Sequence, residues 1–136
     1  MIEQLFNDYL AAFKNYNLDN VAKCYHLPCT LHTPDKLVFL KTVEECKNEF
    51  GKIFAQLKQA NTAEITARKA SFSTITESLL LACVDWDFID AQGEVFADFC
   101  AVYNLAIIES ELKIISVVSH DLSNTLTLEQ PFVITS

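Results

Sequence analysis

The stretch DYLAAFKNYNLDNVAKCYHLPCTLHTP, from Asp8 to Pro34, predicts two helices followed directly by a strand. Apolar residues recur at spacings of three and four from Ile2 to Phe13, which is the pattern of an amphipathic helix. Asp19 is then the expected N-cap of a short second helix that extends to Tyr25. Pro28 should end this helix, because the residue before a proline avoids helical backbone angles.

Outward from this stretch, the chain reads as two short strands, a third helix and four long strands. The short strands flank a Pro-Asp turn, and Thr42 with Glu45 three residues later forms the capping box of the third helix. Its apolar stripe comprises Val43, Cys46, Phe50, Ile53, Phe54 and Leu57. The expected strands cover residues 29–33, 36–41, 64–74, 78–90, 94–109 and 112–120.

Helices come first in this order and a meander of long antiparallel strands follows. That arrangement predicts an α+β fold in which three N-terminal helices cover one face of a strongly curved antiparallel or mixed sheet. We expect a single domain over residues 1–136, with residues 122–136 as a C-terminal tail. In the second long strand Trp86 alternates with Asp85 and Asp87, so these aspartates should lie on the opposite face, at a solvated edge or a dimer rim.

The composition restricts the classes of partner. The formal net charge is −8 and Arg68 is the single arginine, which argues against nucleic-acid or anionic-membrane binding and favours a neutral, cationic or apolar partner. No basic region precedes an apolar run at the start, so no signal peptide is expected. The five cysteines have apolar neighbours, and we expect them to be reduced thiols buried in a cytoplasmic protein.

One cluster suggests chemistry, namely Cys24, His26, Cys29 and His32. Structural zinc sites usually join two pairs of ligands from separate segments, whereas these four residues share one stretch. Cys29 and His32 also have opposite parity on a strand, so they should point to opposite faces. A Cys/His nucleophile pair lacks a supporting elbow or flanking glycine. We therefore predict no metal and no cofactor.

The stretch from Asp8 to Pro34 and the element order that follows resemble the nuclear transport factor two-like superfamily, which includes SnoaL-like polyketide cyclases and ketosteroid isomerases. The resemblance extends to about Asp121. It implies a cone-shaped fold, in which the helices close a bent sheet around an apolar pocket, and many members are homodimers.

Ketosteroid isomerases of this superfamily use a tyrosine on the first helix, an aspartate base before the first-strand proline and a protonated aspartic acid on a later strand. Tyr9 matches the tyrosine, and Asn104 lies near the third position. Thr33 stands where the base is expected, and a threonine cannot take up a proton near neutral pH. This difference argues against steroid isomerase activity.

Three functions remain open on these grounds. The first is a small-molecule-binding protein of SnoaL-like type. The second is an isomerase, dehydratase or cyclase acting on an apolar carbonyl compound, with Tyr9 and Asn104 as donors and His32, His120 or Asp121 as base. The third is a protein-interaction module.

The sequence also suggests ligand-binding residues and a homodimer, whereas in a protein-interaction module the sheet would bind a protein partner and the pocket would be residual. By strand parity, only one of His120 and Asp121 should face the pocket. Apolar residues on both faces of the long strands, such as Val102 and Val118, predict a homodimer through the sheet, unless the tail covers that face. The candidate ligand-binding residues are Tyr9, Tyr25, Thr33, Trp86, Phe88, Asn104, His120 and Asp121.

Overall fold

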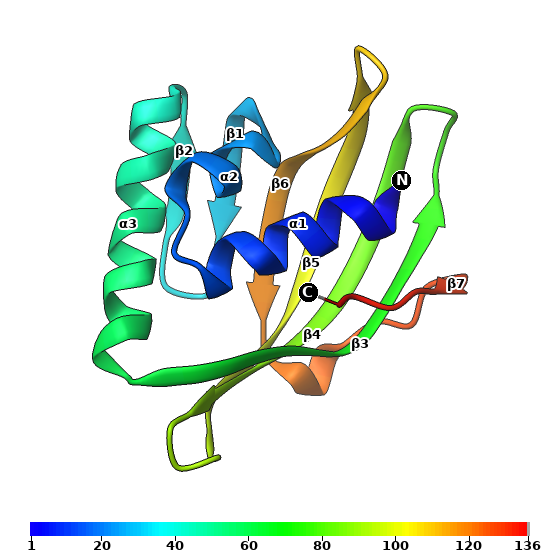
Figure 1. The fold of residues 1–136 in the computed structure, drawn as a ribbon. Coiled ribbons are helices and arrows are strands. Elements are labelled where there is room, and N and C mark those ends of the chain that lie inside the picture. Colours follow the sequence, from blue (N-terminus) through cyan, green and yellow to red (C-terminus); the bar gives the residue numbers. More distant parts are fainter. Residues whose placement is uncertain (136) are drawn as a thin grey trace.

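A computed structural model describes residues 1–135 and contains three helices packed on one face of a curved, unclosed sheet of seven strands (Figure 1). Among these residues, no helix has both the length and the apolar character needed to cross a bilayer. The elements are α1 (Ile2–Lys14), α2 (Leu18–Lys23), β1 (Tyr25–His32), β2 (Leu37–Leu40), α3 (Val43–Gln59), β3 (Thr62–Thr74), β4 (Leu79–Asp90), β5 (Val95–Ile108), β6 (Glu111–His120), a 3-10 turn η1 (Leu122–Asn124) and β7 (Gln130–Pro131).

The strand order across the sheet is β2-β1-β6-β5-β4-β3-β7. Strands β3 to β6 form the expected antiparallel meander, and β1 joins it beside β6 in parallel orientation. The sheet is therefore mixed, and the α+β class predicted from the element order is confirmed. Helix α1 crosses the middle of the sheet, while α3 stands beside β2 (Figure 1).

The second helix is shorter than predicted and begins at a different cap. Asn17, not Asp19, is the N-cap, and its side chain accepts a hydrogen bond from the Asn20 backbone N–H. The helix ends at Lys23, and Tyr25 already opens β1. The cause is tertiary, because the Ile114 N–H donates to the Cys24 carbonyl at 2.8 Å and draws the chain into the sheet. Pro28 therefore lies within β1 and does not end the helix.

Helix α3 begins as predicted. Thr42 and Glu45 form both hydrogen bonds of the capping box. Four apolar residues of the predicted stripe are buried, namely Cys46, Phe50, Phe54 and Leu57. Val43 is 54 % exposed, because the first turn of the helix lies beyond the edge of the core.

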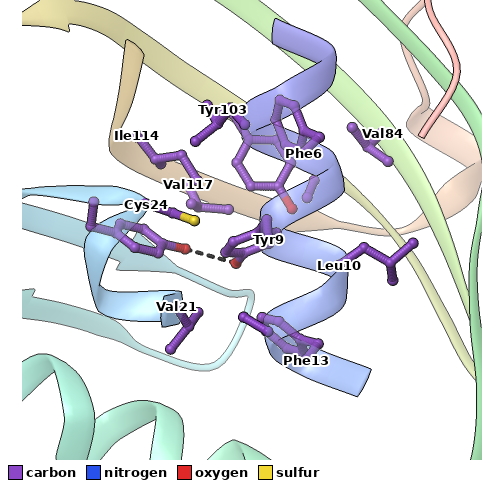
Figure 2. Packing of buried hydrophobic residues seen from close by; sticks show 14 of the residues in the cluster. Phe6, Tyr9, Leu10, Phe13, Val21, Cys24, Val84, Tyr103, Ile114 and Val117 are labelled. Atoms are coloured by element: carbon purple, nitrogen blue, oxygen red, sulfur yellow. Dashed lines mark hydrogen bonds between the residues drawn. The ribbon is translucent and has the colours of Figure 1, made fainter. Parts of the chain in front are cut away.

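Aromatic rings join α1 to the sheet (Figure 2). Phe6 is fully buried, and its ring centroid lies 4.9 Å from that of Tyr103 and 5.6 Å from that of Phe132. Further along α1, Phe13 contacts both Phe50 and Phe54 of α3 edge to face. These contacts fix α1 over the sheet and α3 beside it.

Residues 121–135 form a strap around the edge strand β3. On the sheet face opposite the helices, the Thr125 hydroxyl donates to Asp85 at 2.7 Å. At the edge, β7 pairs with β3, and beyond it Ile134 is buried and the Thr135 N–H donates to the Asn7 side chain of α1 at 2.8 Å. The strap therefore connects the outer face of the sheet to the first helix.

Candidate functional site

A cavity of about 620 Å³ lies between the helices and the concave face of the sheet. Its buried end is aromatic, and its exposed end is polar. The buried lining includes Tyr9, Tyr25, Phe50, Trp86 and Tyr103. The exposed lining includes His32, Pro34, Lys36, Lys52, Gln56 and Asp121.

Three tyrosine hydroxyls and one indole N–H gather at the buried end. The hydroxyls of Tyr9 and Tyr25 are 2.8 Å apart, and the Trp86 indole N–H donates to the Tyr103 hydroxyl at 2.9 Å. Tyr9 also interacts with Tyr103 through its hydroxyl, and their ring centroids are 6.0 Å apart. Burial raises the pKa of Tyr9, Tyr25 and Tyr103 above that of an ordinary tyrosine, so all three are neutral donors near pH 7.

This cluster has more donors than it uses internally. Trp86 contributes one hydrogen and the three tyrosines contribute one each, whereas the cluster contains three contacts among these groups. Each contact uses one hydrogen, so one hydrogen is left for an acceptor outside the cluster. An oxygen atom of a molecule in the cavity would supply such an acceptor in surroundings that are otherwise apolar.

Several polar groups at the mouth are engaged with one another or with the backbone. The Lys36 ammonium pairs with Glu49 at 3.0 Å. The Asp121 carboxylate accepts from the Ser123 N–H at 2.8 Å as the cap of η1, and this hydrogen bond lowers the pKa of Asp121. A His120 ring nitrogen lies 3.0 Å from the Asn124 carbonyl. These contacts hold the mouth in place and make Asp121 a weaker base than a free aspartate.

Most of the residues proposed from the sequence lie around this cavity. The expectation that one of His120 and Asp121 would face away is wrong, because both line the cavity. Strand β6 ends at His120, so alternation no longer constrains Asp121. The residues that line the cavity are Tyr9, Tyr25, Thr33, Trp86, Phe88, His120 and Asp121.

Asn104 lies on the other face of the sheet, which corrects its place in the candidate site. Its side chain donates to the Ser116 hydroxyl at 2.7 Å and is exposed. The inward residue is its neighbour Tyr103, because successive strand residues point to opposite faces. The signal available in the sequence was the polar Asn104 between apolar Tyr103 and Leu105, which places Asn104 on the opposite face of the strand from them. It identifies Tyr103 as the site residue that was missed.

The exposure of individual side chains bears on two further expectations from the sequence. Asp85 is not at a solvated edge, because it is 5 % exposed and covered by Thr125 of the strap. Asp87 does remain near solvent, where it pairs with Arg68. In the segment that had suggested zinc, Cys24 and Cys29 are buried whereas His26 and His32 are exposed, so the structure does not bring the four together.

Comparison with known proteins identifies the family. A family model described as NTF2-like protein (DUF6841) matches residues 1–122. No curated protein matches the sequence.

Solved structures with this fold have little sequence in common with the chain. An NTF-2 like protein of unknown function from Shewanella oneidensis MR-1 is 15 % identical with a TM-score of 0.72, over 88 % of this chain and 96 % of that one. An NTF2-like protein with a cystatin-like fold from Novosphingobium aromaticivorans is 9 % identical with a TM-score of 0.74, over 90 % and 80 %. A provisionally named ketosteroid isomerase from Shewanella frigidimarina is 15 % identical with a TM-score of 0.70, over 86 % and 92 %. At these identities the likeness establishes the fold and not an activity.

Proposed function

The chain belongs to the NTF2-like family, and we propose that it binds a small, largely apolar molecule that carries one hydrogen-bond acceptor, such as a carbonyl oxygen. The observation that carries the proposal is the group of three tyrosine hydroxyls and one indole N–H at the buried end of an aromatic cavity, whose hydrogens outnumber the contacts among them. An apolar body would fill the cavity, and the acceptor would complete the hydrogen bonding of the tyrosine cluster.

The size and charge of the site support the same class of ligand. A cavity of about 620 Å³ is within the range that binds a small organic molecule. The net charge of −8 disfavours a strongly anionic ligand. We therefore expect a neutral or cationic amphiphile with its acceptor directed inward.

A pair of probes of the same shape tests this proposal. We expect 2-acetylnaphthalene to bind about 5–10-fold more tightly than 2-isopropenylnaphthalene, because one net hydrogen bond contributes about 1 kcal/mol. Trp86 is the single tryptophan and lies in the cavity wall, so its fluorescence reports binding directly. In the triple variant Tyr9→Phe, Tyr25→Phe, Tyr103→Phe, which removes all three hydroxyls of the cluster, the preference for the ketone should shrink.

Tyr16→Phe is the matched control, because Tyr16 packs against Phe54 and Lys58 outside the cavity lining. It should leave the ketone preference unchanged. Equal binding of the two probes, or a preference that survives in the folded triple variant, would contradict the proposed role of the hydroxyl cluster.

The enzyme alternative requires a base close to a bound carbonyl compound. Thr33 cannot serve as one, and the lowered pKa of Asp121 weakens it as a base. His32 and His120 lie on the lining and are the remaining bases that the sequence suggested. Binding without a reaction is therefore the simpler proposal. Loss of the ketone's α-hydrogen signals in deuterated buffer, dependent on either histidine, would favour an isomerase, dehydratase or cyclase instead.

We also propose a homodimer formed through the outer face of the sheet. The strap covers this face near Asp85 but leaves apolar side chains open on several neighbouring strands. Burying such a face against a second copy would stabilise association by a two-fold contact. These exposed or half-exposed apolar residues are Leu37, Phe39, Leu79, Val102, Ile115 and Val118.

Val118→Asp should convert this dimer into a monomer. Val118 pairs with Val102 in the middle of the open face, so an aspartate there would have to be buried without a partner. We expect the dimer dissociation constant to rise at least about 100-fold, measured by analytical ultracentrifugation. Val43→Asp, on the exposed start of α3, is the control and should remain dimeric. A native protein that is monomeric at micromolar concentration would contradict the proposal and favour an interaction module.

The state of the thiols supports a reducing compartment. All five cysteines are free and buried. We accordingly keep the cytoplasm as the proposed location, because disulfides are rare there and free thiols persist.

A further inference from the structure

A second group of chemically active side chains lies on the opposite face of the sheet from the cavity. Cys83 and Asp85 of β4 alternate with the inward residues Val84 and Trp86, so they point outward. Cys100 of β5 is the register partner of Asp85 and shares that face. The three side chains therefore meet under the strap.

These three residues are enclosed. Cys83 is 2 %, Asp85 is 5 % and Cys100 is 0 % exposed. Thr125 of the strap closes the site, because its hydroxyl donates to Asp85 at 2.7 Å and lies 4.0 Å from the Cys83 sulfur. The group thus joins two strands and the strap at one point.

The distances match those among the ligands of one metal ion. The sulfurs of Cys83 and Cys100 are 3.1 Å apart, and one ligand atom from each of the three residues lies within 4.8 Å of the others. Zinc–thiolate bonds of about 2.3 Å at a tetrahedral angle place two sulfurs ~3.8 Å apart. The sulfurs would therefore separate by less than about 1 Å to hold an ion.

The buried carboxylate favours a metal ion over a disulfide. Removing a carboxylate from water is costly unless charges or hydrogen bonds compensate it, and Arg68 pairs directly with Asp87 while it attracts Asp85 from a longer distance. A disulfide between Cys83 and Cys100 would use both sulfurs and leave the Thr125 hydroxyl as the hydrogen-bond partner of Asp85. A divalent cation would instead bind the carboxylate and both sulfurs directly, and its charge would offset two of the three negative charges on the two thiolates and the carboxylate.

We propose that Cys83, Asp85 and Cys100 bind a divalent ion of the zinc type, with water or the Thr125 hydroxyl as the fourth ligand. Two thiols lose their protons as the ion binds, and the two thiolates and the carboxylate then surround the dication. This site could not be predicted from the sequence, because the ligands lie on two strands and no short motif joins them.

The position of this site suggests a structural role. Thr125 belongs to the strap, which continues to β7 and then to Asn7 on α1. An ion at this point would fasten the start of the strap to the sheet, on the far side from the cavity. The site is thus separate from the ligand-binding proposal, and either can fail without the other.

Cobalt titration of the full-length chain tests the metal site. The chain is first freed of metal with a chelator and kept reduced with a phosphine, and Co²⁺ is then added without oxygen. We expect one equivalent of Co²⁺ to give thiolate charge-transfer absorption and the intense visible bands of tetrahedral cobalt. Zn²⁺ should abolish both and raise the melting temperature.

Variants decide which residues hold the ion. We expect Co²⁺ binding to weaken at least about 100-fold in each of Cys83→Ser, Cys100→Ser and Asp85→Asn. Each variant removes a residue that binds the metal directly, and even residues that only hydrogen-bond to a metal ligand typically contribute ~10–100-fold to affinity. Cys29→Ser, a buried cysteine of β1, is the matched control and should keep the native spectrum. Circular dichroism tests whether each variant is folded. If a serine variant does not fold, Asp85→Asn still tests the site, because it keeps both thiols.

Three results would overturn the proposal. The first is the absence of tetrahedral cobalt absorption from the folded native chain. The second is absorption that persists in Cys83→Ser and is lost in Cys29→Ser. The third is a Cys83–Cys100 disulfide forming on addition of peroxide in a chain that binds neither Co²⁺ nor Zn²⁺.

Discussion

Raising the pH from 8 to 11 should lower the free energy of unfolding by at least about 4 kcal/mol. Burial raises the pKa of Tyr9, Tyr25 and Tyr103, so the folded chain keeps these hydroxyls protonated after the unfolded chain has released them near pH 10. Below pH 9 each tyrosine is neutral in both the folded and the unfolded chain, so it does not make the free energy of unfolding depend on pH. Above pH 10 the unfolded state binds fewer protons, and stability falls by about 1.4 kcal/mol per tyrosine for each pH unit.

The buried thiols act in the same direction and begin earlier. Burial raises the pKa of Cys24 and Cys29 to about 12 and that of Cys46 to about 11. In the unfolded chain these thiols ionise near pH 9, so their effect is already present when the tyrosines begin to titrate.

Urea unfolding under reducing conditions, at half-unit steps of pH, measures the slope. In Tyr103→Phe the loss between pH 10 and 11 should be about 1 kcal/mol smaller, because one buried hydroxyl is gone and the unfolded tyrosine is already half ionised at pH 10. The slope is the useful quantity, since removal of a hydrogen-bonding group also changes stability at neutral pH. A stability that stays flat from pH 9 to 11 would contradict the burial of these groups.

Phe6→Ala should destabilise the protein by about 3–5 kcal/mol, which is the usual cost of truncating a fully buried phenylalanine. Phe6 is 0 % exposed and contacts Tyr103 of the sheet and Phe132 of the strap. Its loss would leave a cavity where α1, β5 and the strap meet. The measurement is equilibrium denaturation in guanidinium chloride at neutral pH.

Phe96→Ala provides the comparison, because Phe96 is 40 % exposed and makes one edge contact with Phe88. It should cost about 1 kcal/mol or less. Similar losses for the two variants would show that Phe6 does not link these three elements as described.

The elements that were predicted well are those whose signals are local. Alternation over the long strands and the Thr42–Glu45 capping box depend on neighbouring residues, and both appear in the structure. The end of α2 was missed because it depends on a hydrogen bond between Cys24 and Ile114, ninety residues apart. The strap was likewise foreseen only as a tail, since its contacts with Asp85 and Asn7 are all distant in sequence.

The residues of the candidate site also differ in whether a local pattern in the sequence predicts them. Trp86 and Phe88 follow from strand alternation, whereas Tyr9 and Thr33 followed from the family resemblance, and all four line the cavity. Asn104 was misplaced by one residue, and in a strand one residue reverses the face. The cluster of Cys83, Asp85 and Cys100 requires the register of β4 against β5, which the sequence does not specify.

The two edges of the sheet differ in how readily a strand from another molecule could pair with them. Strand β2 is short, with four residues, but β3 is thirteen residues long, and β7 pairs with it through Ser71 and Phe72. The rest of that border carries the charges of Glu64, Arg68 and Lys69, and charged side chains discourage another chain from adding a strand. Proteolysis between β6 and β7 would allow β7 to leave the sheet. Ser71 and Phe72 of β3 would then be unpaired, and a strand from another molecule could pair with them. The C-terminal residues therefore protect this protein from aggregation as well as stabilising its fold.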